Sequence, residues 1–406
     1  MSTTFRIDRD LPLAALGARS GLLWSRNGFT LAGVGEATRL PLDRPGGFGA
    51  ASQTLAELAG RSEIDLPGAG PVAFAALPFD PDEPGWLIVP EIVVGADTGG
   101  RRWLTVVDQR RTAEEAFERI DRLLAVEVDE PDPERYDLRS PLPAETWRDD
   151  VVAAARDRIR VGDLEKAVLA RELVLTTDRP IRPEVVVERL GASFPNAALF
   201  LVDGFVGASP ELLVSRHDDV VRAHPLAGTA ARATDPAIDQ RRVSALLASD
   251  KDRWEHRITI DWLLDNLLPF CSYVDAEPEP SIVTMANVHH LGTMVEGRLS
   301  LPAAPILELV AALHPTPAVG GNPQKAALAL IAELERAERG RYGGPVGWLD
   351  AAGNGEFAVA IRSAQMTGTE TRLFAGVGVV ADSDPAAELA ETRAKFKAML
   401  GALLVP

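Results

Sequence analysis

The chain has 406 residues and a formal net charge of −17 at pH 7. This acidic balance disfavours nucleic acids and anionic membranes as partners, because both require a basic surface. No apolar stretch approaches the roughly 18 residues of a membrane span, and the N-terminus MSTTFRIDRD is charged where a signal peptide would be apolar, so we expect a cytoplasmic protein. A single cysteine, Cys271, excludes an internal disulfide and a multi-cysteine metal site.

Lysine is scarce in this chain. Of 42 basic residues only five are lysines, at positions 166, 251, 325, 395 and 397. Lys166 lies inside an apolar, strand-like run. A lysine can act as an amine base when burial or neighbouring charge lowers its pKa, whereas arginine stays protonated. The distribution of lysine therefore points to the C-terminal part of the chain as the chemical part.

The first third of the chain alternates strand-like and helix-like patterns, with turn clusters at 65–71 and 79–86, and carries no evident chemical constellation. We interpret residues 1–140 as the N-terminal scaffold part of one fold and residues 141–406 as its catalytic region. Between them, residues 127–143 are rich in proline and acid, which suits an exposed connection.

A helix is expected from Thr146, which with Asp149 resembles a capping box, to about Gly162. The strand KAVLARELVL follows, with Lys166 and Val168 on one face. We expect further strands at 198–208, 281–299, 343–347, 358–361 and 374–380.

Two more helices are predicted in the C-terminal part. One is a long amphipathic helix over 240–268, and the other begins at Asp384, with Pro385 in its first turn. Strands grouped with segregated helices indicate an α+β layer architecture.

Two acidic doublets lie on these two helices. Asp252 and Glu255 are three residues apart, as are Glu388 and Glu391, so each doublet projects from one helix face. Facing helices of this kind would make an oxygen-only site suited to Mg2+. Solvated helix surface remains the alternative interpretation for either doublet.

Lys166 and Glu211 each enter from a strand that otherwise reads as buried. A lysine base and a carboxylic acid form a general acid/base pair when their environments shift their pKa values apart. A structural ion pair between them is the alternative. Adjacent His289 and His290 should point to opposite faces of a strand and so cannot easily share a metal.

Nine sequence motifs in order resemble the chorismate-utilising enzymes, a family that contains isochorismate, salicylate, anthranilate and aminodeoxychorismate synthases. They span about residues 146–402 and read KAVLAR, GASPELLV, HPLAGTAAR, SDKDRWEH, HHLGTMVEG, HPTPAVGG, RYGGPVGW, AIRSA and AGVGVVADSDPAAELAETRAK. The resemblance implies a large α+β fold in which packed antiparallel β-sheets are surrounded by helices.

The resemblance also implies a site. Glu255 and Glu391 match the family's Mg2+ ligands, and Asp252 and Glu388 match carboxylates that act through water. The substrate chorismate is implied to contact Ala227, Gly228, Thr229, His290, Ala318, Tyr342, Ile361, Arg362, Gly376, Gly378 and Lys395. Metal and local cations would let an acidic protein hold a dianion.

The nucleophile separates the members of this family. Anthranilate synthases usually have Gln where Lys166 stands, and aminodeoxychorismate enzymes have a nucleophilic Lys where this chain has Ala227. Lys166 as the base that activates water and Glu211 as the acid that protonates the leaving C4 hydroxyl imply an isochorismate synthase. No glutamine amidotransferase subunit is then needed, and we expect a monomer.

Salicylate synthases share this half-reaction and then eliminate pyruvate. Ala318 and Ile361 stand where these lyases tend to have Thr and Leu, which favours stopping at isochorismate, whereas Tyr342 leaves some lyase activity open. A chorismate-binding homologue without catalysis and an unrelated Mg2+ hydrolase are further alternatives. The motifs leave open whether isochorismate would feed menaquinone, a catechol siderophore or another product.

Overall fold

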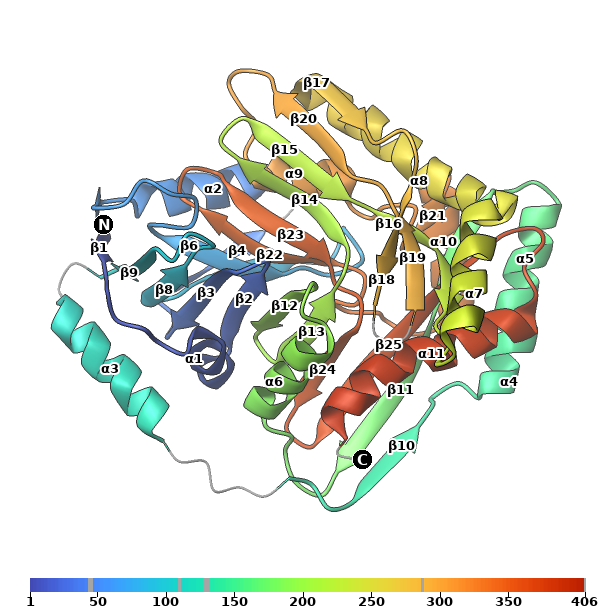
Figure 1. Cartoon of the computed structure of the whole chain (residues 1–406), viewed down its shortest axis with the longest axis horizontal. Coiled ribbons are helices and arrows are strands. Elements are labelled where there is room, and N and C mark those ends of the chain that lie inside the picture. Colours follow the sequence, from blue (N-terminus) through green and yellow to red (C-terminus); the bar gives the residue numbers. More distant parts are fainter. Residues whose placement is uncertain (43–46, 109–110, 127–131, 286–287, 405–406) are drawn as a thin grey trace.

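The computed structural model describes residues 1–406 except 43–46, 109–110, 127–131, 286–287 and 405–406. In the described residues the strands form three sheets, and helices cover their outer faces (Figure 1). Apart from β1 (Thr3–Arg6) with β5 (Arg61–Ser62), which run parallel, the strands pair antiparallel. The expected α+β fold with packed antiparallel sheets is confirmed.

The largest sheet has 13 strands within the described chain, with β21 attached to the side of β11. In spatial order it contains β10 (Tyr136–Arg139), β11 (Lys166–Thr177), β25 (Glu370–Val379), β24 (Ser363–Thr367), β13 (Phe205–Ser209), β12 (Ala198–Val202), β2 (Leu22–Arg26), β3 (Phe29–Val34), β8 (Ile92–Ala96), β9 (Arg102–Val106), β1 and β5, and beside them β21 (Gly321–Asn322).

The second sheet packs against the first, and a third, smaller sheet lies beside the site described below. The second contains, in spatial order, β17 (Cys271–Ala276), β20 (Val295–Leu299), β15 (Val220–His224), β14 (Leu212–His217), β23 (Gly355–Val359), β22 (Pro345–Asp350), β6 (Val72–Ala76), β7 (Gly85–Val89) and β4 (Thr38–Leu42). The third contains β16 (Leu226–Ala231), β19 (Val288–Gly292) and β18 (Ser281–Thr284).

Helices lie outside these sheets. They are α1 (Leu13–Ser20), α2 (Gly47–Glu57), α3 (Ala113–Ala125), α4 (Ala144–Thr146), the π-helix η1 (Trp147–Val152), α5 (Ala153–Arg160), α6 (Pro183–Ser193), α7 (Pro236–Ala248), α8 (Asp250–Leu267), the 3-10 helix η2 (Leu268–Phe270), α9 (Ile306–Leu313), α10 (Gln324–Glu335) and α11 (Pro385–Leu403). None of the helices in the described residues combines the length and apolarity that a bilayer span requires.

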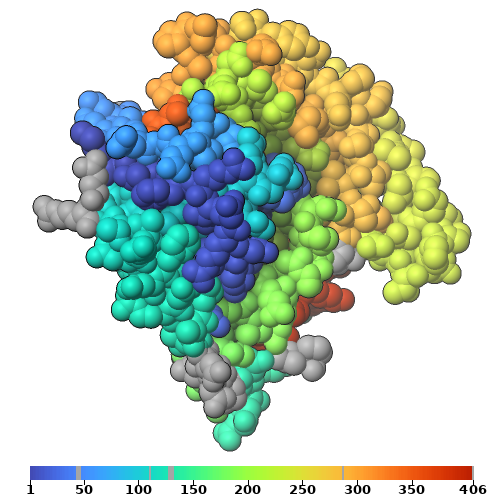
Figure 2. Space-filling model, turned by 60° about the vertical axis from the view of Figure 1, so that its left-hand side comes forward, coloured from blue at the N-terminus to red at the C-terminus, as the bar shows by residue number. Residues whose placement is uncertain are grey.

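The N-terminal strands continue the sheets of the C-terminal part. β2 pairs with β12 in the large sheet, and β6 pairs with β22 in the second sheet. Figure 2 shows the N-terminal residues, blue to teal, gathered over one side of the molecule. The residues between 1 and 106 therefore extend both layers.

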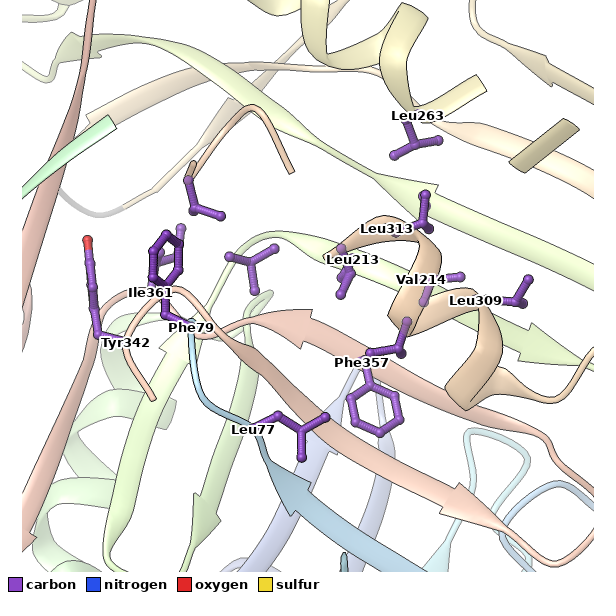
Figure 3. Close-up of a cluster of buried hydrophobic side chains, with 14 of the residues drawn as sticks. Leu77, Phe79, Leu213, Val214, Leu263, Leu309, Leu313, Tyr342, Phe357 and Ile361 are labelled. Atoms are coloured by element: carbon purple, nitrogen blue, oxygen red, sulfur yellow. The ribbon is translucent and has the colours of Figure 1, made fainter. Parts of the chain in front are cut away.

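Two apolar clusters join the layers. Trp24 and Phe200 of the large sheet pack with Phe74 and Trp348 of the second sheet, all at most 1% exposed. A larger cluster joins the second sheet to α8 and α9, and Figure 3 shows Tyr342, Ile361 and Phe79 together at one end of it. The core thus reaches the side chains that line the site.

The single helix expected over 240–268 is wrong. Ser249 has an extended backbone (φ −76°, ψ 111°), and its hydroxyl accepts a hydrogen bond from the backbone N–H of Asp252. It is therefore the N-cap of a new helix, and α7 and α8 are separate. The break lies just before the first acidic doublet, which is therefore in the first two turns of α8.

The single strand expected over 198–208 is also wrong. Asp203 (φ 53°) and Gly204 (φ 74°) form a two-residue turn between β12 and β13. An Asp-Gly pair suits this kind of hairpin turn, because both central residues need positive φ. The segment 281–299 is likewise divided into β18, β19 and β20, and positions 286–287 of the prediction lie outside the described residues.

The expected cap at Thr146 is wrong as well, while the one at Asp384 is confirmed. The helix already runs from Ala144, and Thr146 has helical angles and no side-chain cap hydrogen bond. Asp384 accepts a hydrogen bond from the N–H of Ala386, and Pro385 opens α11. Of the connection 127–143, residues 127–131 lie outside the described residues, and exposed β10 lies at the sheet edge.

Candidate active site

One cavity of about 270 Å³ collects side chains from ten segments of the C-terminal part. Its walls come from β11, β25, β16, β19, α8 and α11 and from four connecting loops. Every site residue expected from the sequence lines it: Lys166, Glu211, Ala227, Gly228, Thr229, Asp252, Glu255, His290, Ala318, Tyr342, Ile361, Arg362, Gly376, Gly378, Glu388, Glu391 and Lys395.

Lys166 is buried at the first position of β11, with 1% of its side chain exposed. Its Nζ lies 2.8 Å from Oε1 of Glu255 on α8. Burial acts to raise the pKa of the Glu255 carboxyl, but Lys166, with smaller contributions from Lys251 and Lys395, holds that pKa below its ordinary value. The structural ion pair considered between Lys166 and Glu211 is thus formed with Glu255 instead.

Glu211 follows β13 and lines the same cavity. Burial raises the pKa of its carboxyl to about 7, against the lowering influence of Arg362, the backbone N–H of Leu226 and Lys166. The turn is fixed by Ser209, whose Oγ accepts from the N–H of Glu211 and donates to the carbonyl of Val359. Near neutral pH this carboxyl can therefore hold a proton and donate it.

The two acidic doublets face one another from α8 and α11. Burial and then Glu391 raise the pKa of Glu388 to about 7. Burial also raises the pKa of Asp252, and Glu255 and Glu391 add to this effect. The four carboxylates are near enough to repel one another, which excludes the alternative of two separate solvated surfaces.

These carboxylates fit a divalent cation. Glu255 and Glu391 already hold ammonium groups, from Lys166 at 2.8 Å and from Lys395 at 2.7 Å. In the described residues, however, no three His, Cys, Asp or Glu side chains make a ready ligand set. Mg2+ commonly takes one or two protein carboxylates and completes its shell with water and ligand oxygens. Glu255 and Glu391 are the residues that would hold it.

Cationic and neutral donors occupy the other end of the cavity. The half-buried Arg362 has a left-handed φ of 49°, which non-glycine residues rarely adopt and which is most common at functional sites. Its Nη2 lies 2.6 Å from Nε2 of His290. Because arginine can only donate, Nε2 accepts, and the proton of His290 is on Nδ1, which faces the carbonyl of Gly228.

His290 is neutral for a physical reason: burial, Arg362 and Lys395 lower its pKa well below the ordinary value. His289 points the other way and contacts Asp239, which confirms that the two histidines lie on opposite faces. Tyr342 accepts a hydrogen bond from the N–H of Gly376 at 2.7 Å, so its own proton remains available to a ligand.

Two residues that line the cavity were not predicted from the sequence to do so. Lys251 was not among the expected site residues, yet it lines the cavity, half-exposed, with its Nζ 3.9 Å from Oε1 of Glu388. Its position beside Asp252 was a usable signal. Arg339 also lines the cavity, and no pattern in the sequence separated it from the 36 other arginines.

Replacing Gly378 by alanine is expected to reduce turnover by about 10²-fold. The added Cβ would lie 2.5 Å from Oε1 of Glu255 and 3.0 Å from Cε of Lys166, so the pair would have to shift. A displacement of about 1 Å of a catalytic group lowers the reaction rate by about 10²-fold. The matched control is Gly401→Ala in α11, where a Cβ meets nothing within 4 Å. Steady-state kinetics with thermal unfolding tests this, and full turnover in Gly378→Ala would contradict it.

Comparison with known proteins shows to which family the chain is related. A family model described as chorismate binding enzyme matches residues 12–404. The isochorismate synthase EntC of Escherichia coli is 37% identical over 336 residues, covering 81% of this chain and 80% of that protein. The isochorismate synthase MenF of Bacillus subtilis is 36% identical over 357 residues, covering 82% and 75%.

The fold agrees with this result. The structure of MenF, the menaquinone-specific isochorismate synthase of Escherichia coli, superposes with a TM-score of 0.82 at 25% identity, covering 100% of this chain and 94% of that one. The match of the family model over nearly the whole chain and the identity to two relatives agree with the motifs that line the cavity. The chain belongs to the chorismate-binding enzyme family.

Proposed function

We propose that this protein is a Mg2+-dependent isochorismate synthase, which converts chorismate to isochorismate. The observation that carries the proposal is the placement of Lys166 and Glu211 in one cavity, with the pKa of the Glu211 carboxyl at about 7. An amine base and a protonated carboxylic acid are the two groups that water addition with loss of a hydroxyl requires. The relatives named as isochorismate synthases support the same reaction.

In the proposed reaction Lys166 accepts a proton from water as the water oxygen bonds to C2 of chorismate. The ring double bond shifts, the C4–oxygen bond breaks, and Glu211 donates its proton to the departing hydroxyl, which leaves as water. One water is consumed and one released, so the product is an isomer. Lys166 is paired with Glu255 in this structure and must give up a proton before it can act.

When bound, Mg2+ would hold the ring carboxylate of chorismate and share the charge of Glu255 and Glu391. Arg362, Lys395 and the hydroxyl of Tyr342 would hold the enolpyruvyl carboxylate in the same cavity. Water is the nucleophile, so no glutamine amidotransferase subunit is required. The isochorismate formed would be available for menaquinone or a catechol siderophore, and the relatives include a menaquinone-specific synthase.

Salicylate synthesis is the second candidate, favoured by the hydroxyl of Tyr342. Incubation of the purified protein with chorismate and Mg2+, with products resolved by chromatography, decides between them. Isochorismate as the main product supports the proposal, salicylate with pyruvate supports the second candidate, and anthranilate formed only with ammonia contradicts both. Stabilisation by chorismate without turnover would indicate a binding protein without catalysis.

Removal of divalent cations with a chelator is expected to lower turnover at least about 10²-fold, because a metal supplies several kcal/mol to such charged sites. Adding Mg2+ back should restore it. The control is the circular dichroism spectrum, which should not change when chelation removes the cation without unfolding the protein. Undiminished turnover after chelation and dialysis would contradict the Mg2+ requirement.

A further inference from the structure

A buried ion pair lies at the cavity wall, where one of its members, Arg339, lines the cavity. Glu335 is the last residue of α10, and Arg336 then turns the chain with a left-handed φ of 54°. This turn brings Arg339 back onto Glu335, and both side chains are only 3% exposed. The guanidinium donates from Nε to Oε2 at 2.8 Å and from Nη2 to Oε1 of the carboxylate. The two side chains therefore form a bidentate pair.

The pair lies along the middle of β11, on the side where no strand of the described chain pairs with those residues. On one side β11 pairs with β25 from Ala167 to Thr176. On the other side β21 reaches only Lys166 and Ala167, and β10 begins to pair at Val174. In the gap, Nη2 of Arg339 donates to the carbonyl of Val168 at 2.6 Å, and the N–H of Ala170 donates to Oε1 of Glu335 at 2.6 Å.

The same guanidinium holds a second wall of the cavity. Its Nη1 donates to the carbonyl of Val319 at 2.9 Å, next to Ala318, and its centre lies 4.1 Å from the centroid of the Phe79 ring. Four of its five N–H groups have acceptors, and Glu335 balances its charge. The guanidinium of Arg339 is thus engaged almost entirely by the protein.

We propose that Glu335 and Arg339 are positioning residues that fix the strand of Lys166 against the loop of Ala318 and Val319. The inference rests on the proposed function, because it concerns the geometry of that same reaction. A guanidinium can bind a carboxylate in two places while it bridges two carbonyls. A lysine has one nitrogen with three protons and cannot do this.

The test is Arg339→Lys, which keeps the charge opposite Glu335 and removes the fork. We expect kcat to fall about 10- to 100-fold while KM for chorismate changes less than about threefold, because the groups that bind the carboxylates are intact. Glu335→Gln should lower kcat by a smaller factor, again with little change in KM. It provides the same test if Arg339→Lys does not fold. The matched control is Arg216→Lys, since Arg216 is also buried and bonds the carbonyls of Asp218 and Gly353, away from the cavity.

A second readout does not depend on catalysis. Amide hydrogen exchange of a peptide covering Lys166–Arg171 should be faster in Arg339→Lys than in wild type and unchanged in Arg216→Lys. Faster exchange with a selective loss of kcat supports the inference. Unchanged exchange, or a loss of activity equal in both variants, overturns it. If wild type forms no isochorismate, the proposed function fails, while exchange still shows whether the pair holds the strand.

Discussion

Replacing Lys166 by arginine is expected to lower turnover of chorismate by about 10²- to 10⁴-fold, the range associated with loss of a general base. Arginine preserves the positive charge beside Glu255 but does not release a proton at any working pH. The side chain is 1% exposed, so solvent cannot readily take its place. Measurement of kcat and KM across pH 6–9 checks this result.

Two further variants sharpen the result for Lys166. Lys166→Met removes the amine at similar length and should be equally inactive, which separates loss of the base from the greater bulk of arginine. Lys397→Arg, at an exposed position of α11, is the matched control and should retain wild-type rates. Turnover within a few-fold of wild type in Lys166→Arg would remove this residue as the base.

Replacing Glu211 by glutamine is expected to lower turnover by a similar 10²- to 10⁴-fold, because the amide cannot protonate the leaving hydroxyl. The pH profile carries more information than the rate. The acid works only when protonated, so kcat/KM of the wild-type protein should fall as pH rises through about 7, the pKa of this carboxyl. The residual activity of Glu211→Gln should lack that decline.

Stability gives an independent check on the same group. The pKa of Glu211 is raised from 4.5 to about 7 in the folded protein. The contribution of this carboxyl to stability is therefore fully present below about pH 4.5 and lost as pH rises through about 7. Glutamine does not titrate, so the Tm difference between Glu211→Gln and wild type should move in favour of the variant from pH 5 to pH 8. A Tm difference that stays constant with pH would mean that the pKa of the Glu211 carboxyl is not raised in the folded protein.

The sequence predicted the membership of the site better than its internal contacts. Alternation along β11 shows which residues share a face with Lys166, and the motifs bring Glu211 and both acidic doublets to one site. Neither gives a distance between side chains on different elements. That Lys166 contacts Glu255 depends on how α8 packs against β11, which neither pattern specifies.

The predictions of helices and strands were wrong where a local turn or cap interrupts a segment that otherwise keeps one periodic pattern. Apolar residues lie on both sides of Asp203 and Gly204 in the segment 198–208, and these two residues reverse the chain because both adopt positive φ. Helical spacing continues through 240–268, yet the hydroxyl of Ser249 caps a new helix. Glu335 and Arg339 went unnoticed for a different reason: a pair at this spacing looks the same on an exposed helix as behind a buried strand.

The pairing of β11 with β25 has a consequence for biosynthesis. Ala167 pairs with Val379, so two neighbouring strands of the large sheet come from segments about 200 residues apart, and α11 follows β25. Contacts of such long sequence separation slow folding, because the loop between them must close first. On the ribosome β11 would wait for its partner until residues 370–379 have emerged, with one apolar edge open to other chains. We therefore expect the chain to depend on chaperones during synthesis, because the strand that carries Lys166 pairs with β25 only late.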